Sequence, residues 1–148
     1  MNKFFQFKDL YTKAVNFYEI DAYLSCLANL NEALSFELPL SEIRLSEAFE
    51  LRGLVKMQLK QYLSSITDFN KAIELNPENE SIYYYRYLAH SVLSQYEEAI
   101  EDCKKFIALE PDNESHQKDL NSLEEIFRLN QRFKKKMGKT YPRDSKSS

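Results

Sequence analysis

Apolar residues recur with the spacing of amphipathic helices along most of the chain. Residues 46–59 and 62–75 each carry such a pattern, which predicts two helices in succession. Pro77 follows the second pattern, and because proline has no amide hydrogen it ends that helix. The stripe of the second helix sits at i, i+3, i+6 and i+7 and consists of Ile66, Phe69, Ala72 and Ile73.

This predicted helix pair occurs more than once. Residues 46–79 align with residues 80–113 without a gap, at an offset of 34. A fixed period of this length indicates stacked helical repeats. A fainter copy at residues 23–36 has an offset of 39, and a helix over about residues 3–18 would pair with it. The matches at offset 34 include Arg52 with Arg86, Tyr62 with Tyr96, Ile66 with Ile100, Asp68 with Asp102, and Pro77 with Pro111.

One further helix is predicted over about residues 114–137, and it carries two apolar stripes. The first stripe, Leu120, Leu123 and Phe127, would cover the exposed end of the stack. The second stripe exceeds what a cap requires, which leaves room for a partner or for a homodimer through this helix. Residues 138–148 form a short, polar, basic tail that we expect to be flexible. The second stripe consists of Ile126, Leu129 or Asn130, Phe133 and Met137.

The repeated residues resemble the tetratricopeptide repeat family. The resemblance rests on Gly53, Tyr62, Phe69, Ala72 and Pro77, and on the string DFNKAIELNP. It implies an all-α fold, a right-handed α-solenoid of three helix-turn-helix repeats plus a C-terminal capping helix. The implied single domain spans 1–137, with repeats at about 6–40, 46–79 and 80–113.

The third repeat departs from the family pattern at two positions. Tyr87 stands where the second repeat has Gly53, and Phe106 stands where it has Ala72. The family places small residues there so that paired helices approach closely. We therefore expect a wider helix spacing or a local rotation in the third repeat.

Candidate chemistry is sparse. His90 and His116 are far apart in sequence, and no carboxylate accompanies them at metal-ligand spacing. With two glycines in the chain, a phosphate-binding loop is not expected. Cys26 and Cys103 fall within apolar helical patterns, which predicts buried reduced thiols. The sequence thus predicts no enzyme, no cofactor and no metal site.

The resemblance implies that the first helix of each pair lines a concave groove. The side chains placed there are largely aromatic and apolar, and tyrosine often dominates binding energy at interfaces. We expect a protein or peptide segment to bind there, with packing on neighbouring helices or on the chain's own tail as the alternative. The predicted partner-binding residues are Tyr11, Val15, Tyr18, Glu50, Leu54, Met57, Tyr84 and Leu88.

One branch of the family binds acidic chaperone C-termini through a clamp of lysine, asparagine and arginine. Carried over by position, these residues would fall here on Glu50, Leu54, Tyr85, Ser115 and Asp119. An anionic terminus would meet Glu50 where the clamp needs a cation. We therefore expect no chaperone-tail binding of this kind, and expect apolar or helical ligands instead.

Charge is distributed unevenly along the chain. Residues 128–148 carry eight basic residues and one acidic residue, so the remainder is strongly acidic for a total of −3. The basic segment would complement the helix dipole and aid solubility, contact an acidic partner, or contact nucleic acid or an anionic membrane. Its central cations are Lys134, Lys135, Lys136 and Lys139.

These observations predict a protein–protein interaction module, such as an adaptor, an assembly factor or a chaperone-like scaffold. No apolar run is long enough to span a membrane, and the first residues lack a secretory signal, so we expect a cytoplasmic protein. The alternatives are a nucleic-acid-associated or anionic-partner-associated subunit acting through the basic segment, and a self-assembling structural protein.

Overall fold

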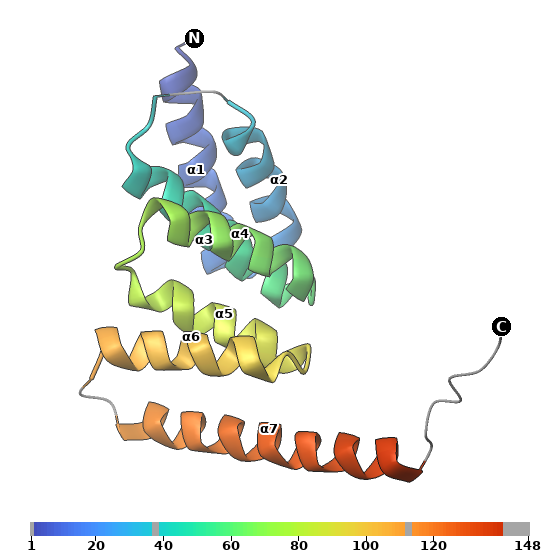
Figure 1. The fold of residues 1–148 in the computed structure, drawn as a ribbon. Helices are drawn as coiled ribbons and strands as arrows, with labels where there is room; N and C mark the ends of the chain where they lie inside the picture. The colour runs from blue at the N-terminus through green and yellow to red at the C-terminus, as the bar shows by residue number, and fades with distance from the viewer. Residues whose placement is uncertain (1, 37–38, 112–113, 141–148) are drawn as a thin grey trace, which may run out of the picture.

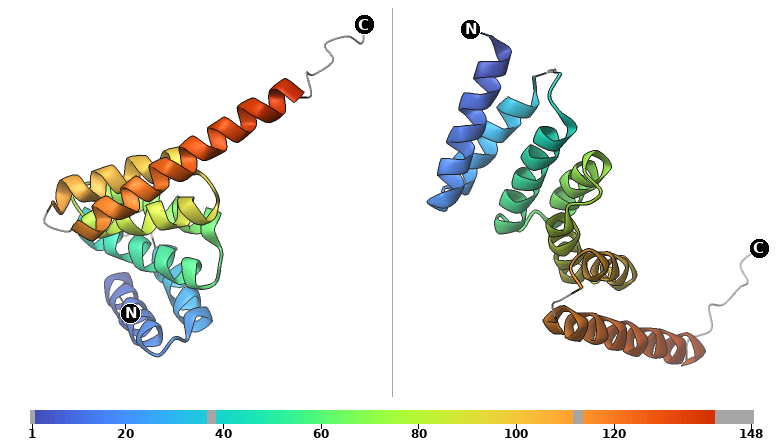
Figure 2. Two further views of the ribbon diagram at one scale, coloured as in Figure 1. Left: turned by 90° about the horizontal axis from the view of Figure 1, so that it is seen from below. Right: turned by 90° about the vertical axis from the view of Figure 1, so that its left-hand side faces the viewer.

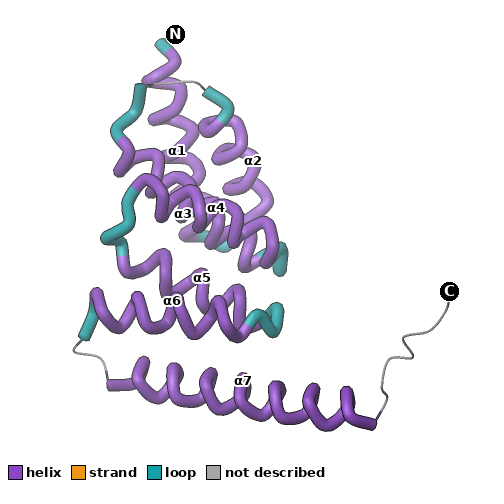
Figure 3. Tube along the Cα trace, viewed as in Figure 1, coloured by secondary structure: helices purple, strands orange, loops and turns teal. Residues whose placement is uncertain are grey.

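A computed structural model describes residues 2–36, 39–111 and 114–140, and within these ranges the chain forms helices and no strands (Figure 3). The helices confirm the predicted all-α fold. Six of them form three antiparallel pairs, and the seventh follows the last pair (Figure 1). The helices are α1 (Lys3–Glu19), α2 (Tyr23–Leu34), α3 (Glu42–Gln58), α4 (Tyr62–Leu75), α5 (Glu80–Val92), α6 (Tyr96–Leu109) and α7 (Glu114–Thr140).

The pairs stack in chain order, as expected for a solenoid. Each second helix contacts the first helix of the next pair, and α7 packs on α6. Two views show the pairs as successive steps, with the far half of α7 extending beyond them (Figure 2). Contacts are therefore made between neighbours along the stack, as in other repeat proteins.

The turn inside each pair is built in the same way three times. Asp21, Lys60 and Ser94 have φ values of 57°, 60° and 58°, and each directly follows the residue after its helix. The next amide donates back across the turn in each case, from Ala22 to Phe17, from Gln61 to Lys56 and from Gln95 to His90, over 2.8–2.9 Å. This arrangement is the Schellman motif, which satisfies carbonyls at the end of a helix.

Polar side chains fix where several helices begin. Asn2 and Asn79 accept hydrogen bonds from the Phe4 and Ser81 amides, over 2.9 and 3.1 Å. Ser41 caps α3 in the same manner, so this helix begins at Glu42 and not at residue 46 as the apolar pattern suggested. The amphipathic pattern marks only the residues that face the core, and a cap can extend the helix beyond them.

A buried ion pair joins the two helices of each of the last two repeats. Asp68 is 2% exposed and receives both arms of the Arg52 guanidinium, over 2.9 and 2.6 Å, and Lys56 lies 2.7 Å away. Asp102 receives Arg86 in the same way, over 2.8 and 2.6 Å. The matches found at offset 34 therefore include an ion pair that joins the two helices in each of the last two repeats.

His90 has partners on both nitrogens of its ring. Its Nδ1 lies 2.8 Å from the Gln95 side-chain oxygen, and its Nε2 lies 3.8 Å from Asp102. His90 occupies the position of Lys56 in the preceding repeat. It therefore belongs to the packing of the third repeat.

At the contact between paired helices, the large side chain lies on the second helix in the second repeat and on the first helix in the third repeat. In the second repeat, Gly53 of α3 faces Phe69 of α4, and the ring is fully buried. In the third repeat, Tyr87 takes the glycine position and Cys103 takes the phenylalanine position, and both join one core cluster. The large residue at 87 is thus matched by a small one at 103, a compensation that the prediction of wider helix spacing did not consider.

The capping role of α7 is confirmed by burial. Leu120 and Leu123 are 7% and 8% exposed and pack on α6, with Phe127 beside them. The helix continues through Gly138 to Thr140, three residues past the predicted boundary. A glycine costs a helix only about 1 kcal/mol relative to alanine, so it does not have to end one. Residues 141–148 of the predicted tail lie outside the described part of the chain.

Candidate partner-binding surface

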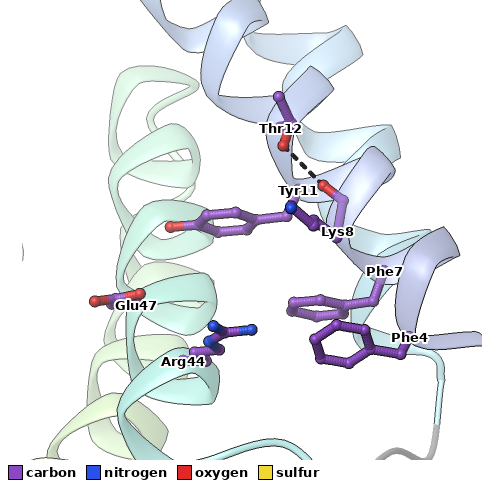
Figure 4. Close-up of a pocket in the computed structure, with 7 residues that line it drawn as sticks. All are labelled: Phe4, Phe7, Lys8, Tyr11, Thr12, Arg44 and Glu47. Atoms are coloured by element: carbon purple, nitrogen blue, oxygen red, sulfur yellow. Dashed lines mark hydrogen bonds between the residues drawn. The ribbon is translucent and has the colours of Figure 1, made fainter.

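The first two repeats form a cleft between their first helices (Figure 4). Its volume is about 310 Å³. The residues from α1 are aromatic or cationic for the most part, and α3 contributes one cation and one anion from the facing side. The lining consists of Phe4, Phe7, Lys8, Tyr11, Thr12, Arg44 and Glu47.

The α1 wall of this cleft is a row of rings. Phe7 and Tyr11 are stacked, with ring centroids 6.1 Å apart and planes 5° apart. The Arg44 guanidinium lies 5.7 Å from the centroid of the Phe4 ring, within cation–π range. Tyr11 reaches across toward α3, so the wall and its opposite side enclose a mixed apolar and polar space (Figure 4).

Glu50 is a half-buried acid on α3, the first helix of the middle repeat. Its carboxylate accepts a hydrogen bond of 2.9 Å from the Asn79 side chain, and the oxygen of the same asparagine side chain caps α5. Burial raises the pKa of Glu50 and the nearby charges of Glu47 and Glu80 add to this, while the Asn79 hydrogen bond opposes it. The site holds a carboxylate among other carboxylates, which favours a cationic ligand group.

Tyrosines from the other two first helices lie within electrostatic range of this carboxylate. Burial raises the pKa of Tyr11, and the charges of Glu47 and Glu50 contribute. Burial also raises the pKa of Tyr85, with further contributions from Tyr18 and Glu50. Groups from α1, α3 and α5 are therefore within electrostatic reach of one another at the centre of the surface.

A second ring cluster lies at the end of the surface next to α7. Tyr84 is 5.3 Å from Phe106 and 5.6 Å from His116, measured between ring centroids. Phe106 and His116 are 4.6 Å apart. Phe106 therefore contacts α7 and Tyr84, although it occupies a position that is small in the second repeat. Glu80 and Glu110 line the same shallow hollow.

All eight residues predicted to bind a partner are half-buried. Leu54 and Met57 pack against the cluster of Phe69, while Tyr84 and Leu88 pack against that of Tyr87. Tyr11 and Tyr18 pack on the core of the first pair, and Val15 lies between them on α1. Much of their surface is thus used within the fold, and their role in partner binding stays a prediction.

The sequence did not lead us to several residues of the cleft, namely Phe4, Phe7, Lys8, Arg44 and Glu47. A signal was present for the rings, because Phe4, Phe7 and Tyr11 follow one another at i, i+3 and i+7. Arg44 lay before the predicted start of its helix. Its position beside Phe4 depends on the angle between two repeats, which the sequence pattern does not specify.

The far half of α7 exposes both the predicted cations and the second apolar stripe. Lys134, Lys135 and Lys136 are exposed and lie within the helix. Lys139 also lies in the helix, but its side chain is outside the described residues. The exposed fractions of the second stripe are 42% for Ile126, 54% for Leu129, 65% for Phe133 and 47% for Met137.

The structure shows the burial of the two cysteines and the grouping of side chains that could bind a metal. Cys26 and Cys103 are free and buried, and burial raises the pKa of each thiol to about 11. In the described ranges, no three or more His, Cys, Asp or Glu side chains converge as a metal site would need. No helix within these ranges is long and apolar enough to cross a membrane.

Comparisons with known proteins show what this chain is similar to. A family model described as tetratricopeptide repeat matches residues 46–79, one full repeat of the chain. No curated protein sequence matches this chain. The matched repeat and the stacked helix pairs are similar to those of tetratricopeptide repeat proteins.

Solved structures share this fold at low sequence identity. The first tetratricopeptide repeat domain of Spaghetti (RPAP3), bound to an HSP90 peptide, matches with a TM-score of 0.72 at 20% identity. The match covers 82% of this chain and 93% of that domain. The second tetratricopeptide repeat domain of human RPAP3, in complex with an HSP70 peptide, matches with a TM-score of 0.71 at 16% identity. This match covers 83% of this chain and 98% of that domain. MamA has a TM-score of 0.75 at 18% identity and covers 83% and 69%.

Proposed function

We propose that this chain is a non-catalytic protein-interaction module that binds a segment of a partner protein along α1, α3 and α5. The binding surface consists of the cleft lined by Phe4, Phe7 and Tyr11 and the adjoining carboxylates Glu47 and Glu50. The observation that carries the proposal is the ring-lined cleft with Glu47 on its α3 side and the half-buried Glu50 about one turn further along α3. Glu50 accepts one hydrogen bond from Asn79. A half-buried carboxylate beside the charges of Glu47 and Glu80 would be stabilised by a cationic group of a ligand.

The same residues specify the chemistry of the partner. Apolar or aromatic side chains would occupy the cleft, and a lysine or arginine would lie over Glu50 and Glu47. An acidic C-terminus placed at Glu47 and Glu50 would be repelled by them, so the partner group bound at these two residues differs in charge from the chaperone peptides bound by the two RPAP3 domains. The eight predicted residues would contribute the floor around this site.

The cellular role of the chain and its location are also proposed. A single domain over residues 1–137 with this surface suits an adaptor, an assembly factor or a chaperone-like scaffold in the cytoplasm. A second candidate is association with an acidic partner or nucleic acid through the cations of α7. That candidate is supported by the exposed Lys134, Lys135 and Lys136.

Selection from a library of linear peptides displayed on phage tests the proposal without a known partner. On the full chain, we expect enrichment of peptides that combine aromatic or aliphatic residues with lysine or arginine. Selection on Glu47→Lys and on Glu50→Gln should lose the basic residues. Glu97→Lys, the same charge change on the exposed surface of α6, should select the same peptides as the unchanged chain.

Stability separates a binding effect from unfolding in this experiment. Because burial raises the pKa of Glu50 in the folded state, the unfolded chain loses this proton first, and stability falls as pH rises through that interval. Glu50→Gln removes this penalty, so it should be at least as stable as the unchanged chain at neutral pH. The gain should vanish well below the ordinary pKa of glutamate. Peptides with acidic C-termini, or identical pools from all variants, would refute the proposal.

A further inference from the structure

We propose that α7 pairs with α7 of a second copy of this chain, in an antiparallel arrangement centred near Arg128. The pairing is independent of the groove and uses the part of α7 that extends beyond the solenoid (Figure 2). The first observation behind it is the row of exposed apolar side chains at Ile126, Leu129 and Phe133. This row lies about a quarter turn or more from the face that packs on α6, so the cap stays in place when the row is covered.

The spacing of this row matches a helix that packs along another helix. Ser122, Ile126, Leu129 and Phe133 are separated by four, three and four residues, the alternation of core positions in a coiled coil. Met137 lies beside the end of the row and is 47% exposed. A row of this kind covers its apolar surface when a second helix lies along it.

Charge decides the direction of the second helix. The first half of α7, residues 114–127, carries four acidic residues and one lysine. The second half, residues 128–140, carries six basic residues and no acidic one. A parallel pair would set the six cations against six cations, whereas an antiparallel pair sets each basic half against an acidic half.

A single register satisfies both the apolar row and the charges beside it. When Ile126 packs against Leu129 of the second copy, the two-fold axis requires the reverse contact as well. Glu125 then lies beside Arg132 of the second copy, and Phe133 lies beside Ser122. Shifting by one heptad brings the two Arg132 side chains together, which disfavours that alternative.

Charge also favours a second copy over an anionic membrane or nucleic acid as the occupant. Outside residues 128–148 the chain carries about ten net negative charges, which an anionic surface would repel. Nucleic acid would leave the apolar row uncovered. A second copy supplies both an apolar row and an acidic half of matching length.

Sedimentation of the full chain at increasing concentration tests the pairing. We expect a concentration-dependent shift from the monomer mass of 17.5 kDa to twice that value. Ile126→Asp should raise the dissociation constant by about tenfold or more, equivalent to about 1.4 kcal/mol. Leu63→Asp introduces the same charge at another exposed apolar residue, 67% exposed on α4, and should dimerise like the unchanged chain.

Charge exchange tests the register. Glu125→Lys alone and Arg132→Glu alone should each weaken the dimer, and the double variant should regain much of the lost affinity. A spin label on cysteine at position 118 tests the direction, because antiparallel partners would hold the two labels about 28 Å apart along the axis. A parallel pair would bring the labels together and would overturn the proposal.

Two further results would also overturn it. One is a chain that stays monomeric at all concentrations, whether or not it binds vesicles rich in phosphatidylserine. The other is a dimer that Ile126→Asp and Phe133→Asp leave unchanged. Circular dichroism of each variant controls for folding, and we expect unchanged helicity because both side chains are exposed in the monomer.

Discussion

At the scale of single residues, the same position can hold a glycine or a tyrosine, depending on what lies opposite. A Cβ atom added to Gly53 would lie 2.5 Å from Cε1 and 2.8 Å from Cδ1 of Phe69, far closer than carbon atoms pack. The Phe69 ring is fully buried and has little room to move. Tyr87 is accommodated at the equivalent position because Cys103 stands opposite it.

Gly53→Ala should therefore destabilise the chain by about 1–3 kcal/mol in urea unfolding. This loss should exceed the gain of about 1 kcal/mol that alanine brings to a helix. Phe69→Cys will also be costly, but in that background Gly53→Ala should cost little, because the ring is absent. Simple additivity of the two changes would show that the close contact does not limit this site.

At the scale of elements, helix positions followed from the apolar pattern and helix ends followed from local chemistry. The predicted helix over 62–75 matches α4, because the apolar stripe lies within it and Pro77 follows its end. The start of α3 was wrong by four residues, because the Ser41 cap lies outside the apolar pattern. The three left-handed turn residues gave no signal, since none of them is the glycine that such a position favours.

This observation leads to a prediction for the turns. Lys60 holds a φ of 60°, a conformation that costs a residue with a Cβ about 1–2 kcal/mol. Lys60→Gly should stabilise the chain by about 0.5–1 kcal/mol, after allowing for the greater freedom of glycine in the unfolded state. Gln58→Gly, two residues earlier and within α3, should instead destabilise it by a similar amount. Urea unfolding measures both, and a loss of stability in Lys60→Gly would contradict the proposed strain.

At the scale of the whole molecule, the repeat period predicted the architecture better than the binding surface. The offset of 34 identified the stacked pairs because contacts within a solenoid are made between neighbours. It also placed Glu50 and Tyr84 on first helices, and the fainter copy at an offset of 39 placed Tyr11 there. It could not place Arg44 beside Phe4, because that contact depends on how one repeat is rotated against the next.

The same limit explains why several predicted groove residues contribute to packing. Leu54 and Leu88 were assigned to the groove by repeat position alone, yet both pack on core clusters. Successive side chains on a helix diverge by about 100°, so a small rotation of a repeat turns a groove residue toward its neighbour. The cleft and the Glu50 region became visible only when the three repeats were seen together.

Photo-crosslinking in the source cell tests the central claim, that the face of the first helices binds a partner. A photoreactive phenylalanine analogue at Thr12, which lines the cleft, should capture a discrete partner segment that contains basic and apolar residues. The same analogue at Leu63, exposed on α4, should not capture it. Capture at Leu63 with equal yield, or of an acidic C-terminus at Thr12, would contradict the account.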